Sequence, residues 1–204
     1  MTTPSDRQAI EAQIDARILA RLDYWIEQLD RLCAQPSISA QRLGIDECAA
    51  LVATMLREEG YEAEILPTGG SPIVYGDSGP AGQARTLLFY NHFDVQPPEP
   101  LELCDSPPFT LTRVGDKLLA RGVSDDKGQL IIRMAAAAAV RDVLGELPCR
   151  VKFFVEGEEE VGSPNIPPAI DAHKERFAAD GCIWEFGGVD YTGRPTQTLG
   201  MRGL

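Results

Sequence analysis

"TLLFYNHFD", residues 86–94, sets an unbroken apolar run directly against a histidine and an aspartate. Such a run without alternation is typical of a strand buried on both faces of a sheet. His92 and Asp94 stand two positions apart, so in an extended chain they point the same way and the carboxylate can orient the imidazole through its second nitrogen. Taken alone, the motif could simply be a polar loop.

The surrounding segments alternate between strand and helix patterns. Apolar runs predict strands, and spacings of three and four predict helices. The predicted strands are 61–67, 72–76, 86–91, 150–156 and a buried strand at 181–186, with a hairpin over 107–122, and the predicted helices are 6–33, 45–59, 126–144 and 167–180. This order predicts an α/β fold with helices packed on a largely parallel central sheet, in which ligands gather at the carboxyl ends of strands.

Composition limits the classes of function. The chain has 204 residues with 31 acidic against 19 basic side chains, and its net charge of −12 opposes binding to nucleic acid or anionic membrane but tolerates cations. The longest apolar stretch, "MAAAAAV" at 134–140, is far shorter than the ~20 residues of a membrane span. The first residues lack the plan of a secretion signal. We therefore expect a soluble, cytoplasmic protein with no nucleic-acid or membrane partner.

The five cysteines are scattered and form no C-x-x-C pair. Their spacing therefore indicates neither a disulfide framework nor a zinc site built from thiolates. We expect buried or half-buried thiols in a reducing compartment. They are Cys33, Cys48, Cys104, Cys149 and Cys182.

Three predicted strands run into residue types that bind metals. The strand at 86–91 leads to His92, the strand at 150–156 leads to the glutamate run "EGEEE", and "GCIW" leads to Glu185. Because carboxyl ends of parallel strands share one edge of a sheet, these side chains are expected to converge. A solvated charged turn is the alternative for the glutamate run by itself.

A fourth contribution comes from "GVSDDKG" at 122–128, which places Asp125 and Asp126 at the start of a predicted helix. Helix N–H groups and the helix dipole favour carboxylates there, so a simple helix cap is the alternative. Taken together, the four segments predict a site rich in oxygen ligands with one imidazole. That donor set suits zinc, manganese or cobalt rather than a calcium loop.

The motifs "NHFDVQP", "ARGVSDDKG" and "EGEEEVGS", in this order, resemble the co-catalytic di-zinc aminohydrolases. That family includes carnosinase-type dipeptidases, aminoacylases, carboxypeptidase G and succinyl-diaminopimelate desuccinylase, and the dipeptidase branch is the most similar. The resemblance implies a metallopeptidase that hydrolyses a peptide or amide bond in a small substrate, a dipeptide or an N-acyl amino acid, with a zinc-activated water.

The resemblance also implies a metal ligand set. His92 and Glu185 would bind one zinc, Glu160 the other, and Asp125 would bridge the two, with Co²⁺ or Mn²⁺ as alternatives to Zn²⁺. Family members carry a non-proline cis peptide after the bridging aspartate, so the Asp125–Asp126 bond is expected to be cis.

Catalytic roles follow from the same resemblance. Asp94 would support the histidine, and Glu159 would be the general base that takes a proton from water and passes it to the leaving amine. Glu156 and Glu158 are expected to be strand-end and solvent-facing charges without a part in the chemistry.

The family's second zinc takes a further histidine from a later segment, which follows a lid and dimerisation domain. Of the two histidines here, His173 is expected on a solvent-exposed helix. We therefore expect residues 1–199 to be the N-terminal part of a catalytic domain and 200–204 the start of a crossing into the lid, in a protein that is a homodimer when complete. The alternative function is that of a truncated, inactive fragment that only folds, binds metal in part or associates with a missing half.

Overall fold

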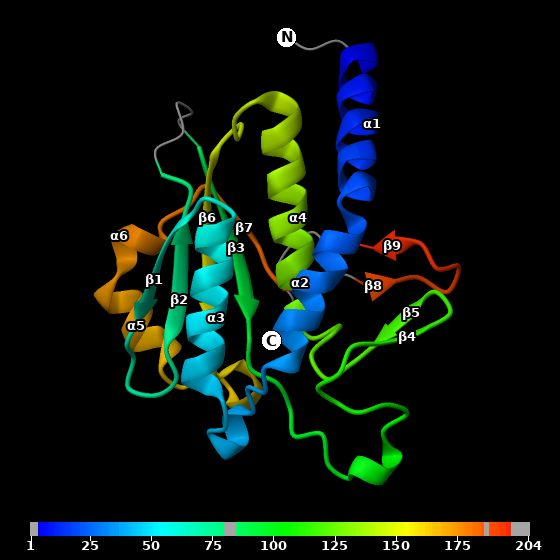
Figure 1. Cartoon of the computed structure of the whole chain (residues 1–204). Helices are drawn as coiled ribbons and strands as arrows, with labels where there is room; N and C mark the ends of the chain where they lie inside the picture. Colours follow the sequence, from blue (N-terminus) through cyan, green and yellow to red (C-terminus); the bar gives the residue numbers. More distant parts are fainter. Residues whose placement is uncertain (1–3, 80–84, 186–187, 197–204) are drawn as a thin grey trace.

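The protein is built around a five-stranded sheet (Figure 1). The computed structural model describes residues 4–79, 85–185 and 188–196. The predicted crossing at 200–204 therefore lies outside the described residues. In spatial order the strands are β1 (Glu62–Leu66), β2 (Ile73–Asp77), β6 (Arg150–Glu156), β3 (Thr86–His92) and β7 (Gly181–Ile183).

The sheet is mixed, and its parallel half positions the site. Strand β3 pairs parallel with both β6 and β7, whereas the β1–β2 and β2–β6 pairs are antiparallel. The register sets His92 beside Glu156 and Phe89 beside Ile183. The predicted α/β fold is thus confirmed, and three strand ends meet at one edge.

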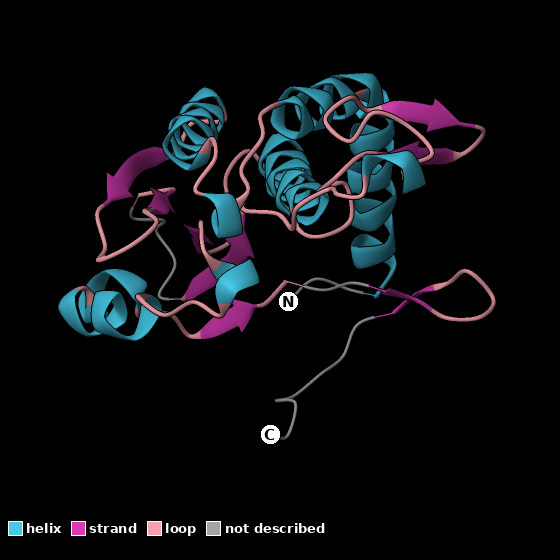
Figure 2. Cartoon of the chain, turned by 90° about the horizontal axis from the view of Figure 1, so that it is seen from below, coloured by secondary structure: helices cyan, strands magenta, loops and turns pink. Residues whose placement is uncertain are grey.

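Helices cover both faces of the sheet (Figure 2). One face carries α2, α3 and α4, and the other carries α5 and α6. The helices are α1 (Pro4–Ala20), α2 (Leu22–Ala34), α3 (Ile45–Glu58), α4 (Lys127–Leu144), α5 (Ile166–Ala172) and α6 (Lys174–Phe177). Three short 3-10 turns lie at η1 (Ser39–Gln41), η2 (Leu101–Leu103) and η3 (Glu159–Val161). The described residues also form two separate hairpins, β4 (Thr112–Val114) with β5 (Lys117–Leu119) and β8 (Gly188–Val189) with β9 (Pro195–Thr196).

Two hydrophobic cores lie on opposite faces of the sheet. The larger core packs α2, α3 and α4 against residues such as Phe153, which is fully buried, and it takes in Ala135 and Ala138 of the alanine run. These small side chains let α4 approach the strands closely. The smaller core packs Tyr90 and Phe154 under α5 and α6.

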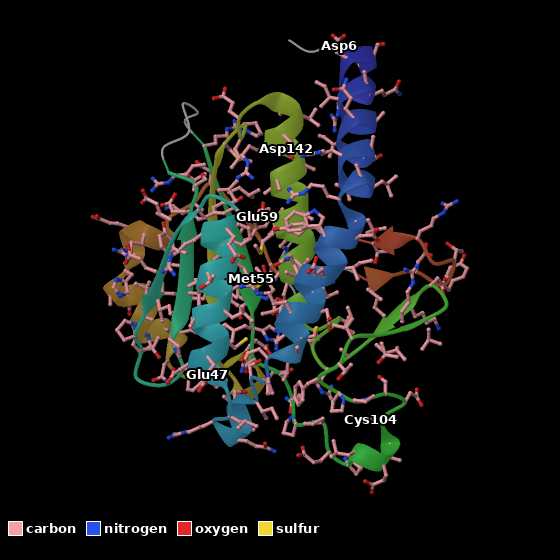
Figure 3. All side chains as sticks on the ribbon, viewed as in Figure 1. Asp6, Glu47, Met55, Glu59, Cys104 and Asp142 are labelled. Carbon is pink, nitrogen blue, oxygen red and sulfur yellow. The ribbon has the colours of Figure 1, made fainter. Side chains whose placement is uncertain are left out.

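The predicted helix at 6–33 is in fact two helices that break at Arg21. In α1 no residue is fully buried, because this helix leaves the main body and packs along α4 (Figure 1). Arg17 donates to Asp142 of α4 at 2.7 Å (Figure 3). The prediction of one helix was wrong because the apolar spacing continues through Arg21, and α1 and α2 both pack on α4, so the spacing alone does not indicate the break.

Three smaller expectations also need correction. The predicted helix at 167–180 is interrupted at His173, which is half-buried with its ring edge-on to Phe177. Strand β7 lies at the edge of the sheet as described, so its residues are not buried as predicted. Of the cysteines, Cys104 and Cys182 are exposed.

Buried charged groups fasten the helices to one another. Glu59 accepts from Tyr24 at 2.7 Å, and Arg141 donates to the Glu59 carbonyl at 2.6 Å, which ties α2 and α4 to the end of α3 (Figure 3). The buried Lys127 ammonium donates to the carbonyls of Leu32 and Gln35 at 3.0 and 2.7 Å. The start of α4 is therefore anchored to the end of α2.

No helix within the described ranges has the length and apolarity needed to cross a membrane.

Candidate metal and catalytic site

His92, the last residue of β3, is the centre of the site. Its Nδ1 lies 3.0 Å from the Asp94 carbonyl oxygen and 3.4 Å from Asp94 Oδ1, so Asp94 fixes the orientation of the ring. The other nitrogen, Nε2, lies 2.9 Å from Asp125 Oδ1, 3.3 Å from Glu185 Oε2 and 3.8 Å from Glu159 Oε2. One buried imidazole thus faces three carboxylates from three different segments.

Asp94 is buried and connects the two loops that carry the site. Its Oδ1 accepts from the Glu159 N–H and its Oδ2 from the Glu160 N–H, each at 3.1 Å. The close approach of these loops requires glycine at position 157, because a Cβ there would lie 2.4 Å from Cζ of Phe93. The carboxylate predicted to support His92 also supports the glutamate loop.

The two aspartates that precede α4 have different surroundings. The peptide bond between Asp125 and Asp126 is cis, which confirms the expectation from the sequence. The Asp125 side chain is 71% exposed and reaches His92, whereas Asp126 is 1% exposed and its Oδ2 accepts from Asn91 Nδ2 at 2.6 Å and from the His92 N–H at 3.0 Å. No role was assigned to Asp126 from the sequence. Its position directly after Asp125 was the one feature that could have indicated a part in the site.

The remaining predicted ligands are Glu185 and Glu160. Glu185 is nearly buried, and its Oε2 has no hydrogen-bond partner among the described residues. The Glu160 carboxylate accepts from Gln96 Nε2 at 2.8 Å and is not among the carboxylates within 4 Å of the His92 ring in the described ranges. The structure therefore groups Glu185 with His92 and leaves Glu160 at the rim beside Gln96.

The expectation that Glu158 faces solvent was wrong. This side chain is 4% exposed, and it accepts from the Ser71 N–H at 3.1 Å and from the backbone and side-chain nitrogens of Asn165 at 2.7 and 3.1 Å. A Cβ on Gly70 would lie 2.4 Å from its Oε2, so the loop at 67–72 closes tightly on it. Glu158 therefore connects the glutamate loop to Ser71 and Asn165.

Glu156 is the last residue of β6, as expected for a strand-end charge, and its side chain is buried. Its Oε1 accepts from the Tyr90 hydroxyl at 2.5 Å and from Ser163 Oγ at 2.9 Å, while its Oε2 is buried without a partner among the described residues. Burial raises the pKa of Glu156 to about 7.

The electrostatics of the site favour a bound cation. Burial raises the pKa of Glu185 to about 7 and that of Asp126 to about 6. Burial lowers the pKa of His92, but its hydrogen bond with Asp94 and the nearby carboxylates outweigh this and raise the pKa to about 10. In the absence of metal, protons supply the positive charge that the carboxylates require. Donor atoms of His92, Asp126 and Glu185 all lie within 4.8 Å of one another, which makes these three groups a candidate set for holding one ion.

The pKa of Glu156 predicts how stability depends on pH without metal. Its folded pKa of about 7 lies above the ordinary 4.5, so the folded state binds the proton more tightly. The stabilisation is fully present below pH ~4.5 and is lost as pH rises through ~7, and we expect the free energy of unfolding to fall by about 3 kcal/mol over this window from Glu156. Urea denaturation with a chelator at pH 5 and pH 8 measures the fall.

The matched variants are Glu156→Gln and, as a control, Glu62→Gln on the exposed face of β1. Glu156→Gln should flatten the pH dependence of the unfolding free energy, and Glu62→Gln should not. An unchanged slope in Glu156→Gln would contradict the assignment.

Comparison with known proteins agrees with this geometry. Residues 88–196 match Peptidase family M20/M25/M40. The chain is 32% identical over 191 residues to human Beta-Ala-His dipeptidase, covering 87% of this chain and 34% of that protein. It is 32% identical over 200 residues to the Cys-Gly metallodipeptidase of Schizosaccharomyces pombe, covering 89% of this chain and 42% of that protein.

Solved structures show the same relationship. An M20 family metallo-carboxypeptidase from Sulfolobus solfataricus superposes with a TM-score of 0.78 at 37% identity, over 83% of this chain and 39% of that one. Human carnosine dipeptidase 1 superposes with a TM-score of 0.75 at 26% identity, over 86% and 40%. The chain thus spans well under half of the length of these relatives.

Proposed function

Because this chain belongs to peptidase family M20/M25/M40, we propose that it provides the metal-binding part of a hydrolase that cleaves a peptide or amide bond in a small substrate. Dipeptides and N-acyl amino acids are the substrate classes, and two of the relatives are named as dipeptidases. The observation that carries the proposal is the buried imidazole of His92, whose Nε2 faces the carboxylates of Asp125, Glu159 and Glu185.

The first zinc ion would be held by His92, Asp125 and Glu185. Two ligands at ~2.0–2.1 Å from a tetrahedral zinc lie about 3.3 Å apart, and the separations from His92 Nε2 to the Asp125 and Glu185 oxygens are 2.9 and 3.3 Å. Asp125 is favoured over Asp126 as the ligand because Asp126 already accepts two hydrogen bonds that hold the end of β3.

The second ion would share Asp125 and take Glu160, which the Gln96 amide contacts. These two groups are fewer than a four-coordinate site needs. We therefore propose that further ligands come from outside the described residues, with 1–199 as part of the catalytic domain and 200–204 leading into a lid and dimerisation domain. The length of the relatives supports this, since this chain covers 34% to 42% of them.

Glu159 would act as the general base. When bound, the divalent ions polarise the scissile carbonyl and lower the pKa of the attacking water. Glu159 would then take a proton from this water and pass it to the leaving amine. Burial raises the pKa of Glu159, which increases its basicity, and Asp94 holds its N–H at 3.1 Å.

Metal loading provides the test of this function. A protonated His92 must lose its proton to bind an ion, so Zn²⁺ binding near pH 7 is expected to release about one proton or more. Calorimetry in buffers with different ionisation enthalpies measures the release, and metal analysis gives the stoichiometry. The polypeptide that the gene encodes in full should hydrolyse a member of a panel of dipeptides and N-acyl amino acids, lose activity with a chelator and regain it with Zn²⁺.

His92→Ala is the matched control and should bind no ion at the first position. Assays of residues 1–204 alone, beside the full product, test the alternative of an inactive fragment. Two tightly bound ions and equal turnover in residues 1–204 would contradict the proposed external ligands, and tight Zn²⁺ binding by His92→Ala would contradict the site itself.

A further inference from the structure

Arg133 is a buried cation whose guanidinium donates to backbone carbonyls next to the candidate metal site. It lies on α4 and is 6% exposed. Its Nη1 donates to the Tyr90 carbonyl at 3.1 Å and its Nη2 to the Trp184 carbonyl at 2.5 Å. A guanidinium fork thus joins two backbone segments that are 94 positions apart in sequence.

These contacts lie next to the candidate metal ligands. Tyr90 precedes His92 by two residues on β3, and Trp184 immediately precedes Glu185. Arg133 follows Asp126 by seven residues, about two helical turns, so both lie on the same face of α4. One side chain therefore links the three segments that carry His92, Asp126 and Glu185.

Strand β7 gives Glu185 little support of its own. The strand is three residues long, and its pairing with β3 ends at Ile183. Beyond that point Trp184 is held by its carbonyl at Arg133 and by its ring, which stacks on Tyr90 with centroids 3.7 Å apart. The Trp184 Nε1–H then donates to Glu185 Oε1 at 3.2 Å, which leaves Oε2 directed at His92.

We infer that Arg133 is a positioning residue, which fixes Trp184 and through it the carboxylate of Glu185 as a metal ligand. The inference rests on the proposed metal-binding function. Arginine is required because a planar fork reaches both carbonyls at once, whereas a lysine ammonium on the same helix presents a single point of donors. Burial lowers the pKa of Arg133, and the nearby carboxylates of Asp126 and Glu185 partly oppose this effect.

The test uses Co²⁺ as the probe on the purified protein, with absorption of the bound ion as the signal. Arg133→Met is expected to weaken Co²⁺ affinity by about 10- to 100-fold, the range typical of lost outer-sphere partners. Arg133→Lys should recover only part of this loss. In a Glu185→Gln background, Arg133→Met should have no further effect, because its influence acts through Glu185.

Arg141→Met is the matched control, since Arg141 lies on the same helix and also donates to a backbone carbonyl, that of Glu59. It should leave the Co²⁺ affinity and spectrum unchanged. If Arg133→Met does not fold by circular dichroism, Arg133→Gln, which keeps one donor group, takes its place in the same comparison.

A second readout needs no metal. In residues 1–204 with Trp25→Phe, Trp184 is the remaining tryptophan. This residue is 57% exposed but its ring is stacked on Tyr90, so Arg133→Met should lower its fluorescence anisotropy while Arg141→Met should not. Equal Co²⁺ affinity and equal anisotropy in parent and Arg133→Met would overturn the role of Arg133 and leave the proposed function standing. A parent protein that binds no Co²⁺ would overturn both.

Discussion

Glu159→Gln is expected to lower kcat for dipeptide hydrolysis by about 10²- to 10⁴-fold, the usual contribution of a general base, while the metal content stays unchanged. The amide has the shape of the carboxylate but cannot accept the proton of the attacking water. Its N–H still donates to Asp94, so the loop keeps its position. Steady-state kinetics of the metal-loaded, full gene product and metal analysis of the same sample measure the two effects.

Two comparison variants make the result specific. Glu160→Ala should lose metal, because it removes a proposed ligand rather than a base. Glu175→Gln, on the exposed surface of α6, should keep the parent rate and metal content. The proposed base would be wrong if Glu159→Gln hydrolysed dipeptides at the parent rate, and Glu159 would be a ligand instead if the variant lost its metal.

Gly128→Ala is expected to destabilise the fold by about 3 kcal/mol or more, at the upper end for overpacking. A Cβ at this position would lie 2.0 Å from the Val123 carbonyl oxygen and 3.1 Å from its carbonyl carbon. Both contacts are with backbone, which cannot move aside as a flexible side chain does. Because Gly128 is in the first turn of α4, any shift would also displace Asp125 and Asp126.

Urea denaturation at fixed pH, with and without Zn²⁺, measures this loss. Gly181→Ala is the control, because a Cβ there would meet only Leu87 Cδ1 at 4.0 Å, an ordinary contact. Its unfolding free energy should stay close to that of the parent. An unchanged midpoint in Gly128→Ala would mean that the turn before α4 is not packed as described.

The secondary structure was predicted most accurately where the residues of a single segment determine it. The predicted strands at 86–91 and 150–156 match β3 and β6 to within a residue, because each is an apolar run buried on both sides and followed by polar residues. The break at Arg21 was not predictable in this way, since the apolar spacing continues through it. Both α1 and α2 pack on α4, so the break is not visible in the pattern of apolar residues.

The candidate site also has features that the sequence predicts and features that it does not. The approach of His92, Asp125 and Glu185 was predictable, because strand ends and a helix start meet at one sheet edge. The buried state of Glu158 was not, since a charged side chain in a glutamate run ordinarily indicates solvent. Its three N–H donors come from residues 71 and 165, and nothing local to the run predicts them.

The short, edge-lying β7 has a consequence for cooperativity. The candidate ligands come from the interior strand β3 and from the segment after β7, which is held by one guanidinium and one ring stack, so we expect the second segment to open more readily than the first. An ion that binds only the closed form would raise the free energy of that opening by RT ln(1 + [M]/Kd), about 2.7 kcal/mol at a hundredfold excess over Kd. Metal occupancy would thereby set how often the edge of this sheet frays, and a cell starved of the ion would contain a protein with a loosened edge.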